Sequence, residues 1–180
     1  EDASGNIWFG TMEGTGLFYL NSNGNHFQTF HYEEGQLDGV PQNFIKALLE
    51  VEDSKIWVAS RRHGIKVYDE KKGTFEPLPN HIAPPNGMNT PEIGSLMKDS
   101  KGRIWVGTWG GGLNLYDPKT ESFTYYLQME YKEDGLADRF VTDILETDKG
   151  EIWAANTLGI SVLKSEEDLK NGKFTQYNQV

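Results

Sequence analysis

The sequence predicts an all-β protein built from repeats of about 48 residues, and three observations support this. Four of the five tryptophans, Trp8, Trp57, Trp105 and Trp153, recur at intervals of 49, 48 and 48 residues. Short runs of alternating apolar and polar residues follow each of them, and glycine, aspartate or asparagine separates these runs. No segment of useful length shows a helical period. Because an internal repeat governs how the whole chain folds, it takes precedence over local propensity.

Each complete repeat contains four predicted strands. The first strands begin at Ile45, Ile93 and Val141, and each second strand carries the Ile-Trp pair. The third strands follow a glycine, at Leu17, Ile65, Leu113 and Ile160, and the fourth strands open with Phe27, Phe75, Phe123 and Phe174. The first repeat contains no counterpart of the first strand, so we expect 15 strands in total.

Four strands in about 40–50 residues is the size of one β-propeller blade. Since a blade cannot bury both of its faces alone, blades pack side by side around an axis. We therefore predict a β-propeller fragment of about three and a half to four four-stranded blades, spanning residues 1–180. The predicted blades cover residues of about 1–32 (strands two to four only), 43–79, 91–127 and 139–180. A closed ring usually has about 4–8 blades, so we expect a piece of a longer protein.

Composition excludes several classes of function. The formal net charge of -10 argues against a nucleic-acid partner or an anionic membrane surface, because these need clustered lysine and arginine. No run of apolar residues is long enough to cross a membrane. The absence of cysteine excludes disulfides, thiol nucleophiles and zinc–thiolate sites. The four histidines share no repeat position and no metal-like spacing, so neither a metal nor a cofactor is predicted.

The stretch WVGTWGGGLNLYD, from Trp105 to Asp117, raises the question of a phosphate-binding loop. Such a loop needs a helix N-terminus directly after its glycines, whereas an alternating strand follows here. The other three repeats also end this turn in glycine. We therefore interpret the glycines as a β-hairpin turn, in which positive φ angles favour glycine.

Residues 99–126 resemble the two-component regulator propeller repeat, whose pattern is D-x-x-G-x-I-W-V-G-T-x-x-G-G-L-x-x-Y-D followed by F-x-x-Y. The matching residues are Asp99, Gly102, Ile104, Trp105, Val106, Gly107, Thr108, Gly111, Gly112, Leu113, Tyr116, Asp117, Phe123 and Tyr126. The resemblance extends to all four repeats. It is weakest in the second, where Ala59 and Ser60 replace Gly-Thr and Ser54 replaces the turn glycine.

This resemblance implies an extracytoplasmic, periplasmic sensor module of a hybrid two-component system, of the kind common in gut Bacteroidetes. Members of the family precede an immunoglobulin-like domain, a membrane span and a histidine kinase, and commonly sense breakdown products of polysaccharides. The implied partners are an oligosaccharide ligand and the rest of the same sensor chain, and the segment itself is not an enzyme. Two alternatives stay open: a propeller enzyme similar to streptogramin lyase, with His63, His81 and Glu92 as candidate groups, and a structural protein-interaction module.

Candidate site residues are those that depart from the repeat. The repeated tryptophans Trp8, Trp57, Trp105 and Trp153 are predicted to be structural core. Trp109 is the fifth tryptophan and stands at a turn tip, where it either stacks on a ligand or packs under a loop. Arg61, Arg62 and His63 form the matching turn one blade earlier, and either face water or recognise carboxylate or sulfate groups. Asn43, Glu92 and Arg139 stand near the starts of first strands, where side chains reach the same end.

Two further expectations concern the turns and the terminal blades. Asp2, Asp99 and Asp148 lie in the turns between first and second strands, where capping of the turn explains them better than calcium binding. The outer faces of the first and last blades should expose apolar surface. We therefore expect the fragment to self-associate. Two copies could form a ring of roughly eight blades, or a neighbouring copy could supply the missing first strand.

Overall fold

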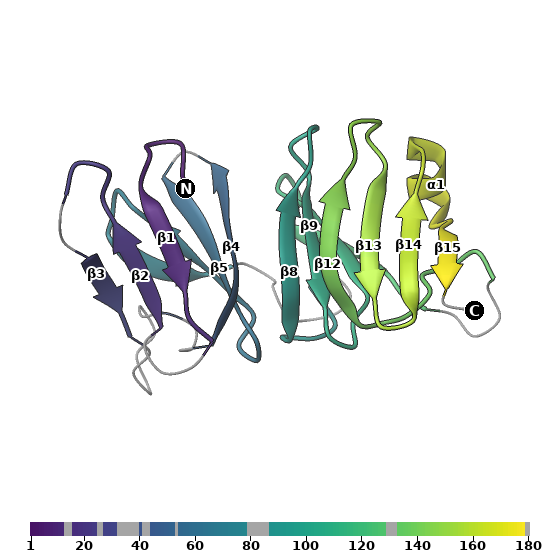
Figure 1. Cartoon of the computed structure of the whole chain (residues 1–180), viewed down its shortest axis with the longest axis horizontal. Helices are drawn as coiled ribbons and strands as arrows, with labels where there is room; N and C mark the ends of the chain where they lie inside the picture. The colour runs from purple at the N-terminus through teal and green to yellow at the C-terminus, as the bar shows by residue number, and fades with distance from the viewer. Residues whose placement is uncertain are drawn as a thin grey trace.

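The structure is a computed structural model that describes residues 1–12, 16–24, 27–31, 40, 44–52, 54–78, 87–128 and 133–178. Within these residues, fifteen strands form four antiparallel sheets, in which neighbouring strands follow one another along the chain. The first sheet has three strands and the other three sheets have four strands each. The four sheets stand side by side in an open arc (Figure 1).

The sheets are built from the following strands. The first sheet contains β1 (Ile7–Gly10), β2 (Leu17–Leu20) and β3 (Phe27–Phe30). The second contains β4 (Ile45–Glu52), β5 (Lys55–Ser60), β6 (Ile65–Asp69) and β7 (Thr74–Pro77). The third contains β8 (Ile93–Lys98), β9 (Ile104–Thr108), β10 (Leu113–Asp117) and β11 (Ser122–Tyr126). The fourth contains β12 (Val141–Glu146), β13 (Ile152–Asn156), β14 (Gly159–Leu163) and β15 (Thr175–Asn178).

The first strands of the complete sheets lie next to one another at the centre of the arc. β4 contacts β8, and β8 contacts β12, whereas each fourth strand lies at the outer edge of its sheet. This radial arrangement is that of propeller blades. The predicted all-β propeller fragment is therefore confirmed.

Three apolar clusters lie between successive sheets and hold them together. Each cluster pairs two kinds of face. One face carries the tryptophan of the earlier sheet, Trp8, Trp57 or Trp105. The other face belongs to the later sheet and is formed by four residues at repeat positions: Ile56, Val58, Tyr68 and Phe75 in the second sheet; Ile104, Val106, Tyr116 and Phe123 in the third; Ile152, Ala154, Leu163 and Phe174 in the fourth. We call these the tryptophan face and the isoleucine face.

The repeated tryptophans are not equally buried. Trp57 and Trp105 are 2% and 0% exposed, and Trp8 is half-buried against the second sheet. Trp153 differs from the prediction, because it lies on the outer tryptophan face of the fourth sheet, which no other sheet of the described residues covers. There its ring stacks on Tyr177 at a centroid distance of 6.0 Å. Trp153 is therefore half-buried surface and not interior core.

The glycine-rich stretch is the β9–β10 hairpin, as predicted. The hydroxyl of Thr108 donates a hydrogen bond of 2.9 Å to the carbonyl oxygen of Gly112. Thr11 makes the same bond to Gly16, and Ser60 makes it to Gly64. The short polar residue three positions after each of these tryptophans thus closes the turn. Gly112 has a φ of +70°, the left-handed region that favours glycine.

We expect Gly112→Ala to destabilise the protein more than Gly110→Ala. Both glycines have positive φ, so alanine at either position costs about 1–2 kcal/mol of backbone strain. A β-carbon at Gly112 would also collide with the carbonyl oxygen of Tyr126, whereas nothing lies within 4 Å at Gly110. This collision should add about 1–3 kcal/mol. Urea unfolding of the two variants measures the difference, and equal midpoints would contradict it.

A short helix, α1 (Glu166–Asn171), interrupts the fourth sheet between β14 and β15. The sequence analysis did not foresee it. Local features at both ends stabilise this helix. The side chain of Ser165 accepts a hydrogen bond from the Asp168 amide, and three acidic residues occupy the first turn. Gly172 ends the helix at a φ of +60°. In the described part of the chain, no helix has the length and apolar character needed to cross a membrane.

Candidate functional site

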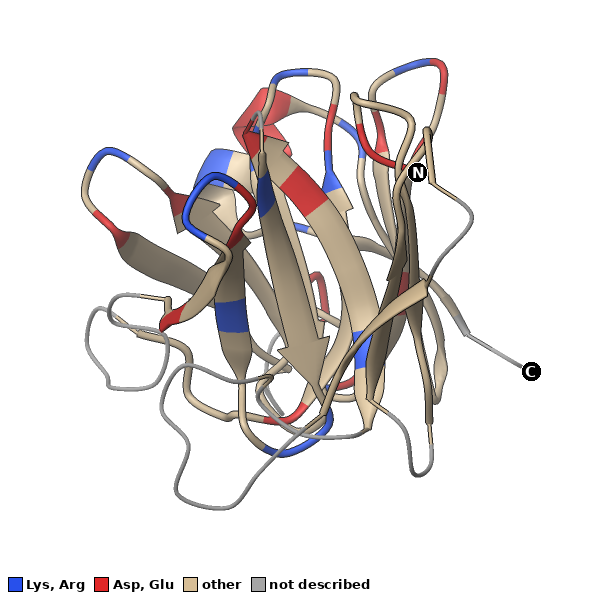
Figure 2. Cartoon of the chain, turned by 90° about the vertical axis from the view of Figure 1, so that its left-hand side faces the viewer, with Lys and Arg blue, Asp and Glu red and all other residues tan. Residues whose placement is uncertain are grey.

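The candidate site lies at the end of the sheets that carries the hairpins between second and third strands. We call this end the mouth and define it as residues 60–64, 91–92, 108–112, 138–140 and 156–158. The opposite end, which carries α1 and the turns between first and second strands, is called the rim; it is the upper end in Figure 1. Many of the charged residues lie in the turns at these two ends (Figure 2).

Trp109 contacts two other segments of the mouth. Its backbone amide donates a hydrogen bond of 2.8 Å to the carbonyl oxygen of Glu92, and its backbone forms a β-bridge with Phe140. The indole meets the Phe140 ring edge-on at 5.7 Å and remains 40% exposed. Trp109 is thus held in place by packing and still presents aromatic surface to solvent.

Arg139 flanks this aromatic pair. Its guanidinium lies over the Phe140 ring at 5.1 Å, which is a cation–π contact. Its carbonyl oxygen accepts hydrogen bonds from the amides of Gly110 and Gly112, at 3.1 Å and 2.9 Å. The β9–β10 turn is therefore bonded to the residue that carries the cation. We refer to Trp109, Phe140 and Arg139 as the Trp109 cluster.

Buried polar contacts position the segment that precedes β12. The hydroxyl of Thr157 donates to the carboxylate of Asp138, which is 5% exposed. The hydroxyl oxygen of Ser161 accepts a hydrogen bond of 2.9 Å from the amide of Ala137. Since these bonds immobilise residues 137 and 138, they also set where Arg139 and Phe140 stand.

A second aromatic–cation pair lies in the preceding blade. The guanidinium of Arg61 lies 5.3 Å from the centre of the Phe44 ring. Arg62 and His63 are exposed in the same turn, and the His63 amide is bonded to Ser60. The amide of Gly64 donates to the carbonyl oxygen of Pro91, so this turn is tied by backbone to the segment that ends in Glu92.

The structure thus brings three predicted site residues together, namely Trp109, Glu92 and Arg139. Arg61, Arg62 and His63 share the same end of the molecule, in the hairpin turn of the preceding blade. Asn43 and His81 lie outside the described residues. Phe44 and Phe140 were missed, although each directly precedes the first strand of its blade. Glu92 occupies the same position in its repeat. Comparing the three repeats at this position would have indicated Phe44 and Phe140 as candidate site residues.

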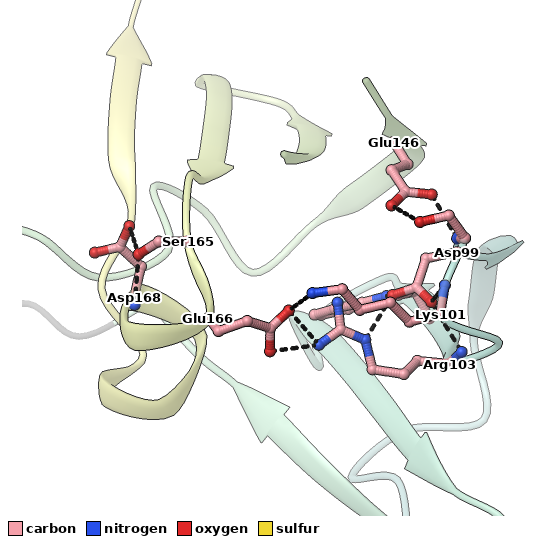
Figure 3. Close-up of polar contacts among 9 residues, drawn as sticks. Asp99, Lys101, Arg103, Glu146, Ser165, Glu166 and Asp168 are labelled. Carbon is pink, nitrogen blue, oxygen red and sulfur yellow. Dashed lines mark hydrogen bonds and ion pairs between the residues drawn. The ribbon is translucent and has the colours of Figure 1, made fainter. Parts of the chain in front are cut away.

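The rim contains a separate polar cluster around Asp99 (Figure 3). One carboxylate oxygen of Asp99 accepts from the amides of Lys101 and Arg103, and the other accepts from Trp105 Nε1 at 2.9 Å and Arg103 Nε at 2.6 Å. The Arg103 guanidinium continues to Glu166 of α1. Burial opposes ionisation of Asp99, but the hydrogen bonds from Trp105 and Arg103 outweigh it and hold its pKa below the ordinary value.

The aspartates of these turns have a structural role. Asp2 repeats the pattern of Asp99, because it accepts from the amides of Ser4 and Asn6 and from Trp8 Nε1 at 2.8 Å. In the fourth blade, Thr147 caps the turn and Glu151 accepts a hydrogen bond from Trp153 Nε1. Asp148 therefore does not have the capping role of Asp2 and Asp99. Within the described ranges, no group of three or more acidic or histidine side chains has a geometry for metal binding.

A cleft of about 390 Å³ lies at the rim between the second and third sheets. Trp57 and Tyr116 line it, together with Glu52 and Glu121. At the next interface, the Arg103 guanidinium covers Trp105 at 5.6 Å and leaves a smaller cleft of about 190 Å³. The cleft of about 390 Å³ therefore lies at the rim, whereas the exposed ring of Trp109 lies at the mouth, at the opposite end of the sheets.

Radial sheets joined by alternating tryptophan and isoleucine faces define a β-propeller fragment. Residues 87–110 match the family model described as two component regulator propeller. This match confirms the resemblance to the two-component regulator propeller repeat that was inferred from the sequence. The matched segment includes both Trp105 and Trp109.

Solved structures share the fold. An extracellular domain described as that of the hybrid two component system BT3049 of B. thetaiotaomicron aligns with a TM-score of 0.68 and 21% identity, over 97% of this chain and 20% of its own. The corresponding domain of BT4673 from the same organism aligns with a TM-score of 0.73 and 19% identity, over 98% of this chain and 21% of its own. This chain thus spans about a fifth of their length.

Virginiamycin B lyase from Staphylococcus aureus also aligns, with a TM-score of 0.66 and 11% identity, over 98% of this chain and 53% of its own. At these identities the likenesses show a common fold and do not establish a common activity. A search of curated proteins finds no match.

Proposed function

We propose that the chain is a ligand-sensing propeller module in the extracytoplasmic, periplasmic part of a hybrid two-component system, and that its mouth recognises a polysaccharide-derived ligand. The family match and the shared fold with extracellular domains of such systems support the class of protein. The ligand is argued from the side chains of the mouth. In this proposal the segment binds and does not catalyse, and its partner is the rest of its own sensor chain.

The exposed ring of Trp109 carries the proposal. An exposed tryptophan backed by a second aromatic ring offers a rigid apolar platform, and such anchors are enriched at binding sites. A sugar ring presents apolar C–H groups that suit this platform. Trp109 also stands where the other repeats have Met12, Arg61 and Thr157, so the repeat itself does not require an aromatic residue there.

The arginines of the mouth suggest acidic substituents on the ligand. Arg139 is exposed beside the platform, and Arg61 and Arg62 are exposed one blade away. A guanidinium binds carboxylate and sulfate groups through paired N–H donors. Since the whole chain has a net charge of -10, positive groups at this end favour an anionic ligand there over binding elsewhere on the surface.

Trp109→Ala and Arg139→Ala are expected to weaken ligand binding by about tenfold or more, because each removes a central contact. Calorimetry with neutral, uronic-acid and sulfated oligosaccharides measures this effect. Arg139→Ala should reduce binding of the acidic sugars selectively. Tyr125→Ala is the matched control, because Tyr125 is 37% exposed on β11, the outermost strand of the third sheet, and is not part of the Trp109 cluster. A panel that yields no binding, or binding unaffected by Trp109→Ala, would count against the proposal.

A further inference from the structure

We propose that the rim cleft between the second and third sheets is a second binding site, which takes a neutral saccharide. The proposal goes beyond the function proposed for the mouth, because it concerns the opposite end of the sheets and a ligand without charge. Each of these two sheets also packs against a further sheet on its other face, so the cleft lies between the two middle sheets of the arc.

The rim of this interface departs from the repeat at the indole N–H of the tryptophan. In the first and third blades, an aspartate six positions before the tryptophan accepts a hydrogen bond from it. These pairs are Asp2 with Trp8 at 2.8 Å and Asp99 with Trp105 at 2.9 Å. In the second blade Val51 occupies the position of the aspartates. Trp57 is only 2% exposed, and among the described residues its Nε1 has no hydrogen-bond acceptor.

The side chain that covers the indole is also different at this interface. At the third interface the Arg103 guanidinium lies 5.6 Å from the centre of the Trp105 ring. Lys55 stands at the position of Arg103 and pairs instead with Glu52 of its own turn, at 3.0 Å. The space beside Trp57 therefore remains open, as a cleft of about 390 Å³ compared with about 190 Å³ at the third interface. A volume of about 300–1,000 Å³ is usual for a small-molecule site.

Two buried polar side chains line this cleft without a protein partner. Trp57 and Tyr116 meet edge-on, with their ring centroids 5.0 Å apart, and both contribute to the cleft wall. Tyr116 is 7% exposed, and within the described ranges its hydroxyl makes no hydrogen bond. A buried polar group without a partner costs free energy, so both side chains favour a ligand that bonds to them. Val51 and Val67 add apolar surface beside the two rings.

The cleft is negatively charged and rich in hydrogen-bond acceptors. In the described part of the chain, its charged lining residues are the acids Glu52, Asp69, Glu76 and Glu121 and the base Lys55. Lysine side chains pair with three of these carboxylates, but each carboxylate can accept further hydrogen bonds. Burial raises the pKa of Tyr116, and neighbouring carboxylates, led by Glu121, raise it further. The tyrosine hydroxyl therefore keeps its proton.

The hydrogen-bonding groups of the cleft select the class of ligand. Trp57 Nε1 needs an acceptor, and the carboxylates need several donors. A hydroxyl group both accepts and donates, whereas an ammonium or guanidinium group cannot accept from the indole. A carboxylate, sulfate or phosphate could accept, but the negative charge of the cleft repels it. A saccharide carries many hydroxyl groups and also presents apolar C–H groups to the two rings, so a neutral saccharide satisfies all of these requirements.

The indole N–H signals in a ¹H–¹⁵N correlation spectrum of the whole chain test the proposal. Trp57→Phe and Trp109→Phe assign the two signals that matter, because each variant loses one of them. Titration with cellobiose, maltose and lactose should move the Trp57 signal with at least one of the three sugars. The Trp105 signal is the internal control and should not move, since Asp99 already accepts from its N–H. The acidic sugars of the mouth experiment report at Trp109, so the two proposals can fail separately.

Val51→Asp tests the site with the residue that the repeat itself uses. Its carboxylate takes the place of the ligand acceptor at Trp57 Nε1, so binding of the neutral saccharide should weaken by about tenfold or more. Val51→Ala is the matched control, because it leaves the indole N–H without an acceptor and should bind as the wild type does. An unchanged circular dichroism spectrum of both variants shows that the fold is retained.

Four results would overturn the proposal. The first is a Trp57 signal that none of the three neutral sugars moves, and the second is saccharide binding that Val51→Asp leaves as strong as Val51→Ala. The third is tighter binding at Trp57 of digalacturonic acid or of the glucosamine disaccharide, which would show a charged ligand. The fourth is tighter binding of a blocked, uncharged trialanine peptide, which would show an amide ligand instead of a saccharide.

Discussion

Trp105→Ala is expected to lower the free energy of unfolding by about 3–5 kcal/mol, the range for truncating a buried aromatic residue. Trp105 is completely buried between the third and fourth sheets. Its loss removes the largest side chain of that interface and leaves the hydrogen-bonding groups of Asp99 without the indole N–H. Urea unfolding followed by circular dichroism measures the effect.

Trp153→Ala is the control that the repeat itself supplies. Trp153 occupies the same repeat position on the uncovered outer face, where it is only half-buried, so its truncation should cost no more than about 1–2 kcal/mol. The unfolding of the two variants should be compared at a protein concentration at which the chain is monomeric. Equal losses for Trp105→Ala and Trp153→Ala would contradict the assignment of the third interface as interior and the fourth face as surface.

Asp99→Asn is expected to have the second largest effect, a loss of about 2–3 kcal/mol at neutral pH, because hydrogen bonds to a charged group contribute more than neutral ones. The Asp99 side chain is fully buried and accepts from two backbone amides, the Arg103 guanidinium and the Trp105 indole. Asparagine keeps the size of the side chain but replaces one accepting oxygen with a donor. Thermal unfolding measures the loss, and Asp148→Asn in the exposed turn of the fourth blade should leave the midpoint unchanged.

The effect of Asp99→Asn should depend on pH with a definite sign. The pKa of Asp99 in the folded protein lies below its ordinary value of 3.8. The ionised carboxylate therefore stabilises the fold fully above that value, and this contribution is lost as the pH falls through the folded pKa. The gap in stability between wild type and Asp99→Asn should be constant near neutral pH and narrow below about pH 4. A gap that is the same at pH 7 and pH 3 would show that the charge of Asp99 does not contribute.

The rim cluster has counterparts in the other interfaces, which explains why it belongs to the fold and not to the binding site. The Ser100 amide donates to the Glu146 carboxylate of the next blade at 2.6 Å, and the Ala3 amide donates to Glu50 of its next blade at 2.7 Å. These pairs occupy the same repeat positions. Contacts that recur with the repeat serve the packing of blade on blade, whereas Trp109 and Arg139 do not recur.

Part of the candidate site could be predicted from the sequence, because each position of one repeat can be compared with the same position of the other repeats. Trp109 was recognisable as an aromatic residue at a position where the other repeats place Met12, Arg61 and Thr157. Glu92 and Arg139 were recognisable from their distance to the first strands. The Phe140 ring under Trp109 was not foreseen, since its contact crosses from one blade to the next and no local pattern within one blade specifies it.

The amino-acid pattern alone establishes the repeat, the strand order, the hairpin character of the glycine-rich stretch and the propeller class, because each depends on residues close together in the chain. Which tryptophan is interior depends on whether another sheet covers it, so the burial of Trp105 and the exposure of Trp153 followed only from the packing of whole blades. The same holds for the Trp109 cluster and for the link from Arg103 to Glu166. Each joins residues about 30 to 60 positions apart, and only the stacking of sheets around the axis brings such residues into contact.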